Sequence, residues 1–122
     1  MEPTKKQLLD KAVEILSDPV RWTQEVMAAD SEGNYTSYEG DSATCFCSIG
    51  AVYRAHYELT GTGLGSAFGE RTLDDALNDL RRAINPKLDP VFVGIALWND
   101  NPDRTHEEVL GTFKAAAASA GE

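Results

Sequence analysis

The clearest element of this sequence is the segment TKKQLLDKAVEIL, which covers residues 4–16. Its apolar residues recur every three or four positions, so a helix would place them on one face: Leu8, Leu9, Ala12, Ile15 and Leu16. Thr4 is followed three positions later by Gln7, a capping-box pattern that satisfies backbone amides which the first helical turn leaves without partners. The segment therefore predicts an amphipathic helix, which Pro19 is expected to end.

The sequence after Pro19 predicts a second, shorter helix over residues 20–29. Its inward-facing side chains are expected to be Trp22, Val26 and Met27. Residues 30–44 are polar, contain glycine and show no periodicity, so they predict one long loop. Apolar spacing resumes after Cys47 or Ser48 and predicts a third helix there, with these residues on one face: Ile49, Val52, Tyr53 and His56.

Glycines interrupt the chain before the next predicted helix: Gly61, Gly63, Gly65 and Gly69. Thr72 and Asp75 form a cap pattern for this fourth helix, and Pro86 is expected to close it. Its apolar stripe has helical spacing: Leu73, Ala76, Leu77, Leu80 and Ile84. Thr105 and Glu108 form a further capping pattern and predict a final helix. The residues that this helix is expected to bury are Val109, Leu110, Phe113 and Ala117.

Residues 91–98 form a continuous apolar run, whose pattern fits either a buried helix or a buried strand. We favour a helix, because the rest of the sequence offers no obvious partner for a lone strand. The expected fold is thus mainly α: a small orthogonal bundle of four to five helices with one long polar loop, in which residues 91–97 are a helix or a short strand. Residues 1–122 are expected to form a single helical domain, since their number is that of one common domain.

The charge is acidic and unevenly distributed. The formal net charge is −9, and a surface of that sign repels phosphate backbones, which argues against direct nucleic-acid binding. No lysine or arginine lies between Arg21 and Arg54, whereas five acidic residues do: Glu25, Asp30, Glu32, Glu39 and Asp41. Such a stretch is either a solvated loop or a surface for a basic protein partner. The residues predicted to meet that partner are Asp30, Glu32, Glu39 and Asp41.

The sequence also predicts where the protein works. The longest apolar run, residues 91–98, is far shorter than the roughly 20 residues that a membrane-spanning helix needs. The N-terminus has no apolar signal-peptide core, so a cytoplasmic protein without membrane association is expected. Cys45 and Cys47 are separated by one residue, and a disulfide across that spacing would be strained. Both are therefore expected to be free thiols.

Cys47 is the candidate for thiol chemistry, because a cysteine at a helix N-terminus gains a lower pKa from the helix dipole. His106 follows it in the sequence, as does Asn99 or Asp100, in the order of a Cys-His-Asn hydrolase. The alternative is a buried structural cysteine, a common environment for this residue type. The spacing of the cysteines and histidines does not match that of zinc ligands, and no metal or cofactor is expected.

The turn Trp98-Asn99-Asp100 carries the densest polar chemistry. Asn and Asp side chains hydrogen-bond to their own backbone in turns, so one interpretation is an elaborate entry to the final helix, with Trp98 in the core. The other interpretation is a binding site for a small molecule or a partner, formed by Trp98, Asn99 and Asp100.

Several segments together resemble a family of short bacterial and phage-encoded proteins known only as a domain of unknown function. The matching segments are Trp22-Thr23-Gln24, then the Cys-x-x-Gly-Ala motif at residues 47–51, and most distinctively Trp98-Asn99-Asp100 with the following Arg104-Thr105. The resemblance implies a helical fold and a bacterial or phage origin, and it implies no activity.

These observations favour a non-enzymatic, protein-binding module: a regulator, or a phage-type inhibitor of a host protein. Small size, high negative charge and the lack of a recognisable catalytic set support this hypothesis. The alternatives are a thiol-dependent enzyme or sensor that uses Cys47, and a small-molecule binder at the Trp98-Asn99-Asp100 turn.

Overall fold

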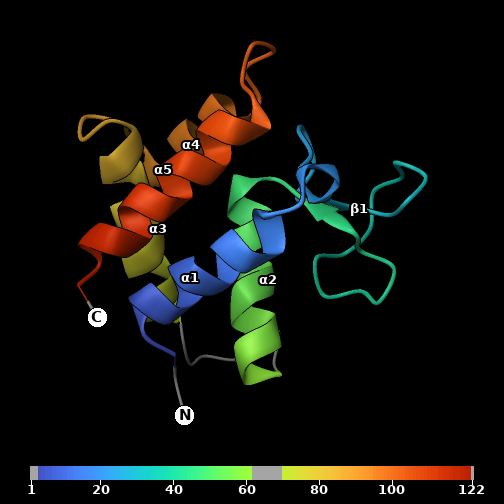
Figure 1. Ribbon diagram of the computed structural model, residues 1–122, viewed down its shortest axis with the longest axis horizontal. Helices are drawn as coiled ribbons and strands as arrows, with labels where there is room; N and C mark the ends of the chain where they lie inside the picture. The colour runs from blue at the N-terminus through green and yellow to red at the C-terminus, as the bar shows by residue number, and fades with distance from the viewer. Residues whose placement is uncertain (1–2, 62–69, 122) are drawn as a thin grey trace.

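The structure is a computed structural model that describes residues 3–61 and 70–121. Within these residues it contains five α-helices and one small two-stranded sheet, so the fold is mainly α-helical, as predicted (Figure 1). The elements are, in chain order, α1 (Lys5–Leu16), the 3₁₀ helix η1 (Pro19–Arg21), β1 (Ala28–Ala29), β2 (Cys45–Phe46), α2 (Ser48–Thr60), α3 (Glu70–Ile84), α4 (Val91–Asn99) and α5 (His106–Ser119).

Helix α1 packs against α2, α3 and α5, and Figure 1 shows it crossing α2. The five residues predicted to face inward are all buried: Leu8, Leu9, Ala12, Ile15 and Leu16. The capping box is also present. The Thr4 hydroxyl accepts a hydrogen bond from the Gln7 amide at 3.1 Å, and Gln7 Oε1 accepts one from the Thr4 amide at 2.8 Å. Local sequence and tertiary packing therefore agree along the whole of this helix.

The prediction of a helix over residues 20–29 is wrong. The chain makes only the short turn η1, which the Asp18 side chain caps, and then continues as bends to β1. The Thr23 amide donates to the Phe46 carbonyl at 3.0 Å. This amide therefore pairs with a distant strand, whereas in a helix it would pair with the carbonyl four residues earlier. Glu25 has φ +75°, a left-handed conformation that a regular helix excludes. Long-range hydrogen bonds have thus overridden the local periodicity.

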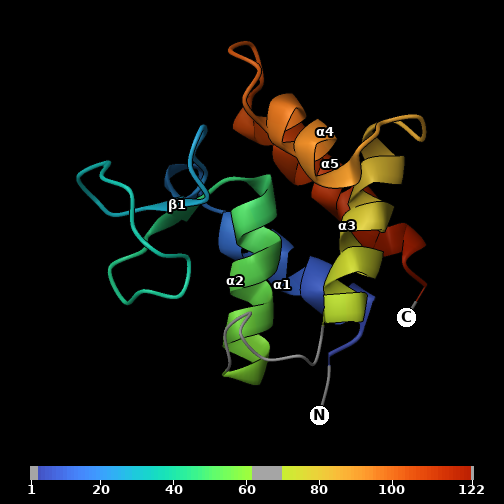
Figure 2. The same cartoon turned by 180° about the vertical axis from the view of Figure 1, so that it is seen from behind.

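The bends lead into a minimal antiparallel sheet. Ala28 lies opposite Phe46, and Ala29 lies opposite Cys45. The segment between the strands is the predicted long loop, and Figures 1 and 2 show this part of the chain standing beside the helices, next to the start of α2. We call residues 30–44 the acidic loop.

Helix α2 begins where the sequence predicted, with Cys47 as its N-cap and Gly61 as its left-handed C-cap at φ +75°. Gly50 lies where the backbone of Met27 passes closest to this helix. A Cβ at position 50 would stand 1.9 Å from the Met27 carbonyl oxygen, so only glycine allows the approach. The other glycines of the predicted break, Gly63, Gly65 and Gly69, lie outside the described residues.

Helix α3 starts at Glu70, three residues before the start that an N-cap at Thr72 predicted, so Thr72 lies inside its first turn and is not the N-cap. Its end at Ile84, before Pro86, agrees with the prediction. Most of its apolar stripe is buried: Leu73, Ala76, Leu77 and Leu80. The Lys5 ammonium lies 3.1 Å from the carboxylate of the buried Asp79, which joins α1 to α3.

The apolar run at residues 91–98 is the helix α4, which settles the alternative left open by its pattern. Only part of it is buried. Ile95 is fully enclosed, whereas Phe92, Val93 and Leu97 are 46%, 49% and 68% exposed. Within the described residues, none of the helices has the length and apolar character that crossing a membrane requires.

Helix α5 completes the core. Its Thr105–Glu108 capping box is present as predicted. Val109, Phe113 and Ala117 are buried, and Leu110 packs against the core while partly exposed.

Candidate functional site

Three segments that are far apart in sequence meet at the side chain of Asn99, which is fully buried at the end of α4. Its Oδ1 accepts three hydrogen bonds: from the Trp22 indole at 2.8 Å, the Ser48 amide at 2.9 Å and the Ser48 hydroxyl at 2.7 Å. Its Nδ2 donates to the Thr23 carbonyl at 3.2 Å and to Asp100 Oδ1 at 3.0 Å. We call these residues the Asn99 network.

The network extends to the residues on either side. The side-chain Nε2 of Gln24 donates to the backbone carbonyls of Asn99 and Asn101, at 2.9 and 2.8 Å. Asp100 Oδ1 accepts from the backbone amide of Glu25 at 2.8 Å, which helps to hold that residue in its left-handed conformation. The polar groups of the Trp98-Asn99-Asp100 turn therefore bind the segment 22–25. Sequence reasoning offered a local turn or a ligand site and did not anticipate this role.

Trp98 takes no part in that network and is held on the other side of the turn. The Arg104 guanidinium lies over its ring, 4.4 Å from the centroid, and Arg104 Nε donates to the Trp98 carbonyl at 2.9 Å. Arg104 also pairs with Glu108 at 3.4 Å, which connects the turn to the first turn of α5. Trp98 is partly buried and packs against the core.

A small pocket adjoins the Asn99 network, and we call it the α4 pocket. It has a volume of about 90 Å³ and lies between the segment 25–27, the start of α2 and α4. Its walls are mainly apolar: Val26, Met27, Ile49, Phe92 and Ala96. Glu25, Cys47 and Asp100 complete the lining and add only a small share of polar surface. Two of the predicted site residues, Cys47 and Asp100, are thus brought together here.

Cys47 is the N-cap of α2, as predicted, and its sulfur accepts a hydrogen bond from the Gly50 amide at 3.3 Å. The prediction that the helix dipole lowers its pKa is wrong. Burial, with the side chain only 7% exposed, raises the pKa of the Cys47 thiol, and the backbone hydrogen bonds at the helix start do not compensate for it. The nearby Asp100 charge acts in the same direction as burial. The thiol is therefore the stable form at neutral pH.

His106 does not complete a catalytic set with Cys47. Its Nε2 is 2.6 Å from the carbonyl oxygen of Leu16, so the ring joins the start of α5 to the end of α1. Within the described residues, neither histidine is hydrogen-bonded to the Cys47 sulfur, and no group of three or more His, Cys, Asp or Glu side chains is arranged to hold a metal ion. Both cysteines are free thiols.

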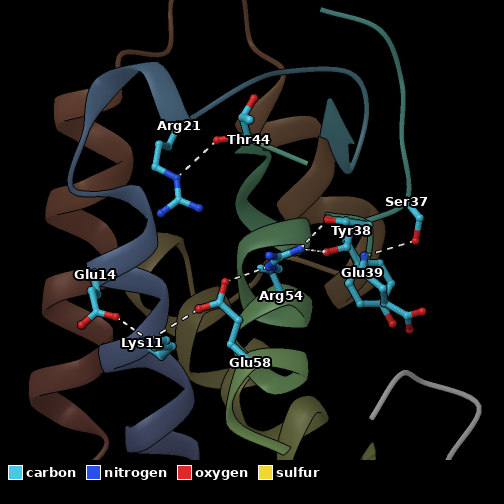
Figure 3. Close-up of polar contacts among 10 residues, drawn as sticks. Lys11, Glu14, Arg21, Ser37, Tyr38, Glu39, Thr44, Arg54 and Glu58 are labelled. Atoms are coloured by element: carbon cyan, nitrogen blue, oxygen red, sulfur yellow. Dashed lines mark hydrogen bonds and ion pairs between the residues drawn. The ribbon is translucent and has the colours of Figure 1, made fainter. Parts of the chain in front are cut away.

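The acidic loop is ordered by its own hydrogen bonds. The Asp30 carboxylate accepts from the amides of Glu32 and Asn34, both at 2.9 Å, so this candidate residue shapes a turn. Arg54 of α2 anchors the other half of the loop, because its Nη1 donates to the carbonyls of Tyr38 and Gly40, both at 2.9 Å (Figure 3). Nothing in the sequence pattern marked Arg54 for this role.

The remaining candidate residues of the loop face solvent to different degrees: Glu32 and Asp41 are exposed and Glu39 is half-buried. Within the described residues, none of the acidic side chains between Arg21 and Arg54 forms an ion pair. The ion pairs involve α1, α2, α3 and α5 instead, as in the Lys11–Glu58–Arg54 group of Figure 3. The loop is therefore a region of uncompensated negative charge.

Three aromatic side chains connect the acidic loop to α4, and we call them the aromatic row. The ring of Tyr38 meets that of Tyr53 edge-on at 5.5 Å, and Tyr53 lies 6.4 Å from Phe92. Phe92 in turn lines the α4 pocket. Loop, row and pocket thus belong to one connected surface, which sequence reasoning missed because its parts come from positions 30–54 and 92–100.

A family model described as "Family of unknown function (DUF6197)" matches residues 1–119 of the chain. The chain therefore belongs to this family of unknown function, in agreement with the resemblance found in the sequence. No curated protein and no solved structure matches it.

Proposed function

We propose that this member of a family of unknown function is a small protein-binding module, which acts as a regulator or as a phage-type inhibitor of a host protein. The observation that carries the proposal is the connected surface formed by the acidic loop and the aromatic row. Its charge and its exposed aromatic side chains fit a partner with a basic surface.

The charge of the loop favours a basic partner. Its exposed carboxylates have no cation of their own among the described residues, so they contribute a field that attracts positive charge. Complementary charge increases the rate of association and selects among partners. A partner with lysines and arginines opposite Glu32 and Asp41 would gain both effects.

Exposed apolar side chains on the same surface supply the other part of an interface. Tyr35 of the loop is 71% exposed, and Phe92, which ends the aromatic row on α4, is 46% exposed. Large rigid aromatic side chains are enriched among the residues that contribute most to protein–protein affinity. The row from Tyr38 to Phe92 brings such anchors beside the acidic charge.

The order of the loop also suits binding. Arg54 and the Asp30 turn fix the loop in the unbound protein, so less conformational entropy is lost when a partner binds. The thiol-dependent alternative is less favoured, because Cys47 is buried, its pKa is raised and no histidine reaches its sulfur within the described residues. A drug-sized ligand at the Trp98-Asn99-Asp100 turn is less favoured too, since the pocket beside Asp100 has about 90 Å³, well below the roughly 300 Å³ of the smallest such pockets.

The test is a capture experiment with matched variants. The tagged protein is used at low and high salt to retain partners from a bacterial lysate, and retained proteins are identified by mass spectrometry. The double variant Glu32→Lys/Asp41→Lys reverses two exposed loop charges, and Asp103→Lys/Glu107→Lys makes the same change in net charge near the start of α5. We expect the loop variant to lose a salt-sensitive partner that the control variant keeps.

A second pair of variants tests the apolar side chains of the proposed surface. Phe92→Ala removes the exposed end of the aromatic row, and Leu59→Ala removes an apolar side chain of similar exposure, 43%, near the end of α2. We expect only Phe92→Ala to weaken capture. A partner that all four variants retain equally would contradict the proposed surface, and the absence of any retained partner at either salt concentration would contradict the function.

A further inference from the structure

The α4 pocket is too small for a nucleotide or a drug-sized molecule, but its volume suits the end of one side chain. Its roughly 90 Å³ corresponds to about three water molecules at about 30 Å³ each. Phe92 lines it and is connected through Tyr53 to Tyr38 of the acidic loop, and Figure 2 shows the start of α2 next to α4 in this part of the molecule. An occupant must therefore be narrow and must arrive at that surface.

The charged residues that line the pocket determine whether its occupant carries a positive or a negative charge. Glu25 and Asp100 both line it, and neither forms an ion pair with a lysine or arginine within the described residues. Oδ1 of Asp100 accepts hydrogen bonds from the Glu25 amide and from Asn99, whereas Oδ2 has no hydrogen-bond partner within the described residues. The third polar group, the Cys47 thiol, is neutral because burial raises its pKa. The two carboxylates therefore favour a cationic occupant over an anionic one.

The apolar walls of the pocket determine what the uncharged part of the occupant must be. Met27, Ile49 and Ala96 offer apolar surface below the carboxylates, and the Phe92 ring is partly exposed beside the pocket. A lysine side chain has the matching parts, since its methylene chain covers apolar surface while its ammonium group binds carboxylates and aromatic faces. The planar guanidinium of arginine is wider than the compact ammonium group of lysine, so a pocket of about 90 Å³ accommodates it less well.

We infer that the α4 pocket receives the side chain of one lysine of the protein partner, with its methylene groups against Met27 and Ile49 and its ammonium group at the carboxylates of Glu25 and Asp100. This inference rests on the proposed function for the origin of the lysine. The backbone at Glu25 is fixed by its hydrogen bond to Asp100, so the position of one carboxylate-bearing residue depends on the other.

The first experiment uses a probe in place of the partner. The protein contains two methionines, Met1 and Met27, so selective methyl labelling gives one NMR signal from the pocket and one internal control. The probe is the capped amino acid Nα-acetyl-lysine-N-methylamide, and its neutral counterpart is Nα-acetyl-norleucine-N-methylamide. We expect the lysine probe to shift the Met27 signal in a saturable way while the Met1 signal stays in place. An equal response to norleucine, or no response to lysine, would overturn the inference.

Two variants locate the binding. Glu25→Gln removes one pocket charge at constant size and should weaken the lysine probe about two- to fivefold, as expected for one solvent-accessible ion pair. Glu32→Gln makes the same change on the loop and should leave the probe titration unchanged. Ala96→Leu fills the pocket and should abolish the shift, with thermal unfolding used to check that the variant folds. If Ala96→Leu does not fold, the pair of glutamate variants still decides the question.

The failure of this inference can be distinguished from failure of the proposed function. The probe titration does not depend on any partner, and the loop-reversal experiment does not depend on the pocket. If a partner is captured through the loop, folded Ala96→Leu should lose it; full retention by that variant would show that no partner side chain enters the pocket and would overturn the inference alone.

Discussion

The indole nitrogen of Trp22 donates a hydrogen bond of 2.8 Å to the side-chain oxygen of Asn99, a residue 77 positions further along the chain. The same oxygen accepts two hydrogen bonds from Ser48. One buried amide therefore fixes the segment after η1, the start of α2 and the end of α4 relative to one another. The α4 pocket lies between these segments, so its geometry depends on the buried Asn99.

Asn99→Ala is expected to destabilise the protein strongly. The substitution leaves the buried Ser48 amide and the half-buried Trp22 indole and Thr23 carbonyl without their partner, and a fully buried group of this kind costs about 1–3 kcal/mol. We therefore expect a loss of about 3 kcal/mol or more in the free energy of unfolding, measured by urea denaturation. Asn34→Ala, at an exposed loop position, is the matched control and should change stability by less than about 0.5 kcal/mol.

Two glycine-to-alanine substitutions should have opposite effects. Gly50→Ala places a Cβ 1.9 Å from the Met27 carbonyl oxygen, which forces the backbone apart, so we expect a cost of about 3 kcal/mol. Gly111→Ala, on the exposed side of α5, meets nothing within 4 Å and should stabilise the helix by about 0.5–1 kcal/mol. Thermal unfolding of both variants tests this, and equal stability of the two would contradict the close approach at Gly50.

Arg54→Lys should loosen the acidic loop while preserving charge. A lysine ammonium cannot reproduce the set of bonds that the guanidinium makes to the Tyr38 and Gly40 carbonyls and to Glu58. We expect faster amide hydrogen exchange at Gly40 and Ala43, whose amides form the backbone turns of this half of the loop. Exchange in α5 should stay as in the natural protein, and unchanged exchange at Gly40 would show that the loop orders itself without Arg54.

Glu58 should contribute stability that depends on pH. Burial alone would raise its pKa, but the hydrogen bonds and charges of Arg54, and then of Lys11, outweigh burial and hold the pKa below its ordinary value of 4.5. A carboxylate whose pKa is lower in the folded state stabilises the protein above its unfolded-state pKa, and this contribution is lost as the pH falls through the folded-state pKa. Glu58→Gln should therefore cost about 0.5 kcal/mol at pH 7 and progressively less below pH 4.5 in urea denaturation.

Cys47 should react slowly with iodoacetamide. Its thiol is buried and its pKa is raised, so at pH 7.5 the reactive thiolate is scarce and poorly accessible. In a Cys45→Ser background, which leaves Cys47 as the sole thiol, we expect alkylation at least about tenfold slower than that of free cysteine. Alkylation as fast as that of free cysteine would restore the thiol-dependent alternative.

The accuracy of the sequence predictions depended on how local the deciding interactions were. α1 and α5 were predicted with their capping boxes, because the pattern of a helix and its cap is contained within one segment. The segment 20–29 has the same kind of local pattern, yet its hydrogen bonds reach Phe46, Asn99 and Asp100, and these partners cannot be read from spacing.

The candidate site shows the same division. Cys47 was predicted correctly as the start of a helix, but its burial depends on the packing of Met27, Ile49 and α4 around it, so the direction of its pKa shift was predicted wrongly. Asn99 and Asp100 were singled out for their chemistry, and their partners in the segment 22–25 became evident only in three dimensions.

The pairing of Ala29 with Cys45 has a consequence for how this chain can change over generations. Residues 30–44 leave β1 and return to β2 at the same point, and Arg54 and Tyr53 of α2 hold the part of the loop around Tyr38 and Gly40. Doubling the length of such a closed excursion costs only about 0.6 kcal/mol. Because the two ends of the loop meet at the sheet, a change in the length of the loop is expected to cost the helices little stability.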